Sequence, residues 1–185
     1  MRGNCQSRAR TAIIALLLWI TCCLGIGCES PREVPPNSLL VEGKGVKESV
    51  LFSVEELKSL EEGIVEAEYF SINSYGTKAY THFKGIWVWY LLSAKVSLTD
   101  DASRVSFIAE DGYTVEYMLE DVKRDDYIDE QNPHTHYKMI LAWEENGYEY
   151  DERDGNPLQL VVGQREPGDV NKPYWVRNVV KISID

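Results

Sequence analysis

The chain has 185 residues, of which 44% are hydrophobic, with 19 basic and 30 acidic side chains. This length suits one domain, and this hydrophobic share is enough for a core, so the composition excludes a globally disordered chain. The formal net charge of −11 becomes −14 without residues 1–27, which hold three arginines and no acid. Because such a surface repels phosphate backbones, we expect no binding to nucleic acid.

The cysteines are confined to the start of the chain. All four lie within the first 28 residues, so residues 29–185 contain no thiol. This distribution excludes a disulfide scaffold, a thiolate metal site and a cysteine nucleophile from the rest of the chain.

Residues 1–27 have the composition of a secretory signal peptide. Arginines at positions 2, 8 and 10 precede an uncharged apolar run over 11–27, which is marginal for a membrane span of about 20 residues. Residues 24–28, Leu-Gly-Ile-Gly-Cys, resemble a bacterial lipobox, although Gly25 stands where a large aliphatic residue is usual. We expect Cys28 to be the lipidated mature N-terminus. Cys23 is a competing site, and an uncleaved signal anchor is the alternative.

Residues 28–38 then predict a tether. The run Glu-Ser-Pro-Arg-Glu-Val-Pro-Pro-Asn over 29–37 is polar and proline-rich, which favours an extended segment. Several acyl chains on Cys28 would hold the protein stably at a membrane. The sequence therefore predicts a cell-membrane lipoprotein whose domain, residues 39–185, lies on the extracytoplasmic face.

In the first half of this domain the pattern predicts strands and two helices. Residues 39–43 favour a strand, and Ser53 with Glu56 forms the capping box of a helix that should end near Gly63. Apolar and acidic residues alternate over 65–69, as in a half-buried strand. Residues 79–86 predict a further strand, and residues 87–94 a short helix.

The second half is mostly strands. We expect strands over 105–109, 113–117, 139–143, 158–162 and 180–184, one helical turn over 119–123, and a polar loop over 124–137. Asn146-Gly147 is a strong hairpin signal, and the largely apolar segment 158–162 favours a central strand. Short strands with a few short helices and no regular βαβ alternation indicate an α+β fold, a mixed and partly barrel-like sheet.

Taken singly, the motifs that could bind a metal or serve acid–base chemistry give weak evidence of a site. His134 and His136 lack a defined third metal ligand, and the acidic run 121–130 lacks the spacing of an EF-hand calcium loop. Asp151 and Asp154 could serve acid–base chemistry, but the sequence does not show that carboxylates converge. We therefore predict no metal site, and exposed polar loops at these positions.

The order of several blocks resembles the sulfite-oxidase-type molybdopterin-binding domain. The blocks are Phe83-Lys84-Gly85-Ile86 with Leu91-Leu92, Asp111-Gly112-Tyr113, Ile140-Leu141-Ala142 with Asn146-Gly147, and 155–162 (Gly-Asn-Pro-Leu-Gln-Leu-Val-Val) with Lys172 and Trp175 behind it. The likeness covers nearly all of residues 39–185. It implies a site built from the loop 73–76, the turn 111–113 and the segment 159–175.

Two departures from that family pattern bear on function. Catalytic members ligate molybdenum through a cysteine in the loop that here reads Asn73-Ser74-Tyr75-Gly76, and the arginine usual after Pro-Leu is Gln159. A serine hydroxyl replaces a thiolate poorly, and glutamine carries no charge for a phosphate. The resemblance thus implies a Cys-less, non-catalytic domain that binds a pterin-like molecule without molybdenum. Its ligand-binding residues would be Asn73, Ser74, Tyr75, Asp111, Tyr113, Gln159, Gln164, Lys172 and Trp175.

Two other readings stay open: a molybdenum-cofactor oxidoreductase with a non-Cys site, and a ligand-free module for surface interactions. Beyond a pterin-like molecule, the expected partners are the membrane, through the lipid, and a membrane protein.

Overall fold

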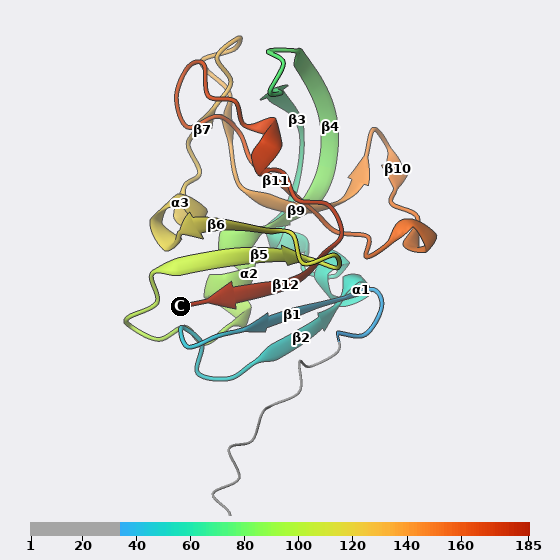
Figure 1. Ribbon diagram of the computed structural model, residues 1–185, viewed down its shortest axis with the longest axis vertical. Helices are drawn as coiled ribbons and strands as arrows, with labels where there is room; N and C mark the ends of the chain where they lie inside the picture. Colours follow the sequence, from blue (N-terminus) through green and yellow to red (C-terminus); the bar gives the residue numbers. More distant parts are fainter. Residues whose placement is uncertain (1–33) are drawn as a thin grey trace, which may run out of the picture. The chain divides into compact units, whose positions relative to one another are not determined.

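The computed structural model describes residues 34–185, so the signal peptide, Cys28 and most of the tether lie outside the described residues. The described part is a mixed α+β structure (Figure 1). No helix within it is long and apolar enough to cross a membrane.

The first sheet joins the two ends of the described chain. Its strands run in the order β2 (Val50–Ser53), β1 (Ser38–Glu42), β12 (Val179–Ile184), β5 (Arg104–Ala109) and β6 (Thr114–Met118). β1 pairs in parallel with β12, while the other pairs are antiparallel. Buried apolar side chains alternate with exposed ones along β6, as the sequence predicts, and buried residues alternate with less buried ones along β5.

The second sheet carries the long hairpin of the molecule. Its order is β10 (Tyr148–Glu149), β9 (Ile140–Glu145), β4 (Lys78–Trp87) and β3 (Ile64–Ile72), and β11 (Gln159–Val161) also pairs with β9. A separate pair, β7 (Tyr127–Ile128) and β8 (His136–Tyr137), lies inside the segment expected as a loop. In the described residues both sheets stay open, and no closed barrel forms.

The helices are short: α1 (Val54–Lys58), α2 (Val88–Lys95) and α3 (Leu119–Lys123), with single 3₁₀ turns at Glu61–Gly63, Glu152–Asp154 and Lys172–Tyr174. A single cluster of buried side chains includes Leu39 and Phe107 of the first sheet and Phe83 and Ile140 of the second. The two sheets therefore share one core.

Two local predictions need correction. The capping box of Ser53 and Glu56 is present, but α1 ends at Lys58 instead of continuing to Gly63. Gly63 lies against the ring of Tyr90, where an added Cβ would be 2.2 Å from a ring carbon, so glycine serves a close approach and not a helix end. The run 158–162 is buried, yet its strand β11 has a strand partner only in β9, with an isolated bridge to Val176 on its other side.

Candidate functional site

The segment 163–178 connects the parts of the predicted site. Asn171, which is buried, accepts a hydrogen bond from the Ile72 N–H at 2.9 Å through Oδ1. Its Nδ2 donates to the carbonyls of Phe70 at 3.0 Å and Val162 at 2.9 Å. One side chain therefore fixes the end of β3 to this segment.

A second connection runs through Glu130. Its carboxylate accepts from Lys78 Nζ at 2.6 Å, from the Gly168 N–H at 2.6 Å and from Gln164 Nε2 at 3.2 Å. The hydrogen bond from the Lys78 ammonium, followed by the one from Gly168, lowers the pKa of Glu130 to about 2. The tip of the β3–β4 hairpin, the loop at 130 and the loop at 168 are thus held together.

The hairpin tip itself uses its polar groups locally. Asn73 Oδ1 accepts from the N–H groups of Tyr75 and Thr77, each at 2.9 Å, which closes the turn. Ser74 is exposed, and the side chain of Tyr75 is 95% exposed. The side-chain oxygen of Asn73 is therefore used by the turn, while the Tyr75 ring is exposed to solvent.

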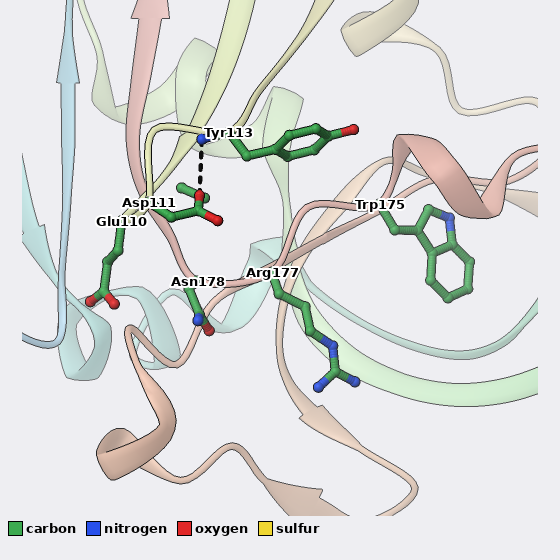
Figure 2. A pocket seen from close by; sticks show the side chains of 7 residues that line it. Glu110, Asp111, Tyr113, Trp175, Arg177 and Asn178 are labelled. Atoms are coloured by element: carbon green, nitrogen blue, oxygen red, sulfur yellow. Dashed lines mark hydrogen bonds between the residues drawn. The ribbon is translucent and has the colours of Figure 1, made fainter.

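The turn between β5 and β6 forms one wall of a surface hollow of about 350 Å³. Glu110, Asp111 and Tyr113 come from this turn, and Figure 2 shows them with the residues of the facing segment. Asp111 Oδ1 accepts from the Tyr113 N–H at 2.9 Å. The Tyr113 ring is 52% exposed, and its hydroxyl donates to the Pro173 carbonyl at 3.4 Å. This leaves part of the Tyr113 ring open to a ligand.

The facing wall consists of Trp175, Arg177 and Asn178. Trp175 is only 7% exposed, because its Nε1 donates to the Val162 carbonyl at 2.8 Å and its ring meets Phe83 edge to face. Arg177 Nη2 is bonded to a carboxylate oxygen of Glu145 at 3.0 Å. The wall carries a cation, and the Trp175 ring is mostly covered.

Lys172 lies on the covered tryptophan. Its Nζ is 3.9 Å from the centroid of the Trp175 ring, a cation–π contact. Burial lowers the pKa of Lys172, because the charged form loses hydration. This lysine therefore packs on the ring and does not project freely towards an anion.

The structure brings together some of the predicted site residues and not others. The same hollow is lined by Asp111, Tyr113 and Trp175. Lys172 contacts the Trp175 ring. The hollow is not lined by Asn73, Ser74, Tyr75, Gln159 or Gln164. Three residues that line the hollow were not predicted from the sequence: Glu110, Arg177 and Asn178. Glu110 lies in the predicted turn, but no pattern in the sequence marks Arg177 or Asn178 as part of a site.

The two buried glutamines have internal partners. Gln159 Oε1 accepts from the Tyr150 hydroxyl at 2.9 Å. Gln164 Nε2 donates to Glu130 and to the Asp169 carbonyl at 3.0 Å, and its Oε1 accepts from the Glu130 N–H. Both amides serve the packing of the domain.

The residues do not fit a molybdenum cofactor of the sulfite-oxidase type. At the implied metal position Ser74 sits in an exposed turn, and a hydroxyl is a poor substitute for a soft thiolate. At the implied phosphate position Gln159 is buried and hydrogen-bonded to Tyr150. In the part of the chain that the structure describes, no group of three His, Cys, Asp or Glu side chains is arranged to hold a metal ion.

Comparison with known proteins finds similarity at the level of structure. No family model and no curated protein matches the chain. The crystal structure of the sulfane dehydrogenase SoxCD from Paracoccus pantotrophus is similar, with a TM-score of 0.60 and 18% sequence identity. The two share a fold. The match covers 82% of this chain and 39% of that chain, so this chain spans about two fifths of its neighbour. The mixed α+β prediction is confirmed.

Proposed function

We propose that this chain is a non-catalytic, lipid-anchored domain on the extracytoplasmic face of a membrane, and that it binds a pterin-like planar molecule. The observation that carries the proposal is the hollow in which Asp111 and Tyr113 meet Trp175, since residues from two distant implied blocks line one space. Its volume of about 350 Å³ lies at the small end of ordinary ligand sites. A ligand there would be only partly enclosed.

The chemistry of the hollow suits an uncharged heterocycle. The half-exposed ring of Tyr113 offers a π-face for stacking. Glu110 and Asp111 offer carboxylate oxygens, and two neighbouring N–H donors on the amino-pyrimidine edge of a pterin match one carboxylate. These two acids and the net charge of −14 oppose a phosphorylated ligand, since Arg177, the cation of the hollow, is paired with Glu145.

Calorimetry with the full chain in a mild detergent tests this proposal. A neutral pterin should bind, and Tyr113→Ala should weaken binding about fivefold or more, because stacking on an aromatic side chain contributes about 1–3 kcal/mol. Tyr75→Ala is the matched control, since its ring is exposed but lies outside the hollow. Asp111→Asn keeps the oxygen that accepts from Tyr113 and removes only the charge. Equal losses for Tyr113→Ala and Tyr75→Ala would contradict this assignment of the site.

The same preparation distinguishes the two alternatives. Stoichiometric molybdenum by elemental analysis, or a clear preference for a phosphorylated pterin, would favour the oxidoreductase. Failure of both pterins to bind would favour the ligand-free interaction module.

Anchoring through Cys28 is tested separately. A Cys28→Ala chain should remain unprocessed or be released from the membrane, and intact mass should show no acyl groups. Cys23→Ala is the control, because Cys23 is the competing position. Unchanged mass and unchanged membrane attachment in Cys28→Ala would rule out lipidation at this residue.

A further inference from the structure

The outer edge of β3 is only partly covered. β3 is the edge strand of the second sheet, with β4 on one side. In an antiparallel pair, alternate residues direct their N–H and C=O groups towards the partner strand and away from it. The Asn73 N–H donates to the Thr77 carbonyl across the hairpin. The backbone N–H and C=O groups of odd-numbered residues of β3 therefore point towards β4, and those of even-numbered residues point outwards.

The even-numbered positions divide into a covered part and an open part. The Phe70 carbonyl and the Ile72 N–H are bonded to Asn171. No hydrogen-bond partner within residues 34–185 reaches the N–H or C=O groups of Glu66 and Glu68. The open stretch is therefore about one short strand pairing in length.

Two hollows follow this open stretch. One, of about 400 Å³, is lined by Glu68 and Tyr80, and the other, of about 320 Å³, by Val65 and Glu66. They share Ala67, His136 and Tyr137, so they adjoin each other between β3 and the segment 136–138, and the two together are called the groove below.

The segment 136–138, which forms the other wall of this groove, is fixed to β3 by side-chain contacts. The ring of Tyr137 stacks on that of Tyr69 with centroids 4.6 Å apart. The Tyr69 hydroxyl donates to the Lys138 carbonyl at 2.7 Å. A segment entering the groove would therefore meet preformed walls, which reduces the entropy lost on binding.

We infer that this groove binds an extended, lysine- or arginine-rich segment of a partner protein by strand addition to β3. Main-chain hydrogen bonds to Glu66 and Glu68 would supply the pairing, as in other edge-strand recognition. The side chain of Glu66 is shared by His82 and Lys84 at 3.6 and 3.3 Å, while Glu68 has no ion pair among the described residues. Basic side chains at alternate positions of the partner would match these two acids.

The same charges argue against a second copy of this chain. An antiparallel pairing of two β3 strands about Ala67 would place Glu66 of each copy opposite Glu68 of the other. Like charges in directly opposed positions destabilise a sheet. Acidic residues on an edge strand thus discourage self-association while leaving the edge available to a basic segment. This inference does not depend on pterin binding.

The test uses a nine-residue peptide of alternating lysine and valine and the corresponding glutamate peptide, with blocked ends, titrated against the full chain in mild detergent. We expect the lysine peptide to bind and the amides of Glu66 and Glu68 to gain protection from hydrogen exchange. Glu66→Pro should weaken binding about tenfold or more relative to Glu66→Ala. Both variants lose the charge, and only proline loses the outward N–H, at a place where an edge strand tolerates it.

A second pair of variants separates specific from general attraction and does not depend on the folding of Glu66→Pro. Glu66→Lys should weaken the lysine peptide much more than Glu116→Lys, which makes the same change of net charge on β6, an edge of the other sheet. Equal effects of these two variants, equal binding of both peptides, or protection away from residues 64–69 would overturn the inference. A dimer that Glu66→Pro dissolves would assign the edge to a second copy instead.

Discussion

Asn171→Ala should destabilise the domain more than the loss of a single hydrogen bond ordinarily does. The side chain is 1% exposed, and it bonds three backbone groups from two separate segments. The Val162 carbonyl keeps a second donor in Trp175 Nε1. The Ile72 N–H and the Phe70 carbonyl face away from β4, so the variant leaves both without a protein partner.

The magnitude follows from these two groups. A buried polar group left without a partner costs about 1–3 kcal/mol, so the free energy of unfolding should fall by about 3 kcal/mol. For a domain of this size that corresponds to a melting temperature lower by about 6–12 °C. Asn132→Ala is the control, because Asn132 is exposed and its side chain makes no hydrogen bond within the described residues; its effect should stay within about 0.5 kcal/mol. Thermal and urea unfolding measure both, and equal stability of the two variants would refute the reasoning.

Two further changes are accessible to the same assays. Because the pKa of Glu130 is held at about 2, below its ordinary 4.5, its contribution to stability is complete above pH 4.5 and is lost as the pH falls towards 2. The difference in unfolding free energy between the wild type and Glu130→Gln should therefore shrink over that range, and a difference that stays constant would show that Lys78 does not stabilise the carboxylate. Gly85→Ala should cost about 3 kcal/mol, because its Cβ would lie 2.2 Å from the Leu141 carbonyl oxygen, whereas Gly76→Ala, with open space but a φ of +76°, should cost about 1–2 kcal/mol. The reverse order of these two would contradict the packing of β4 on β9.

Local signals in the sequence predicted most of the fold. The capping box at Ser53, the Asn146-Gly147 hairpin and the alternation of β6 each depend on neighbouring residues, and each appears in the structure. The sequence placed the end of α1 near Gly63 instead of at Lys58, because the close approach of Gly63 to Tyr90 of a later helix is a tertiary contact that no local pattern reports. Pairing partners, such as those of β11, depend on contacts between distant segments.

The candidate site was predicted only in part, because it too combines local turns with contacts between distant segments. Asp111 and Tyr113 belong to a turn that the sequence identifies, and they line the hollow. Whether Gln164 faces a ligand or the interior depends on Glu130, a residue 34 positions away, and no local pattern reports that bond. Arg177 and Asn178 enter the hollow because the segment before β12 crosses the β5–β6 turn, which is a matter of tertiary structure.

The position of β12 in the first sheet has a consequence for the order in which the chain can fold. β12 lies between β1 and β5, so the earliest described strand is completed only by the last one (Figure 1). During synthesis, the side of β1 that pairs with β12, in the hairpin that carries Leu39 and Val41, would stay unpaired until β12 has formed. Such non-local pairing slows folding and prolongs the exposure of apolar surface. The first sheet is then complete only when this six-residue strand is in place.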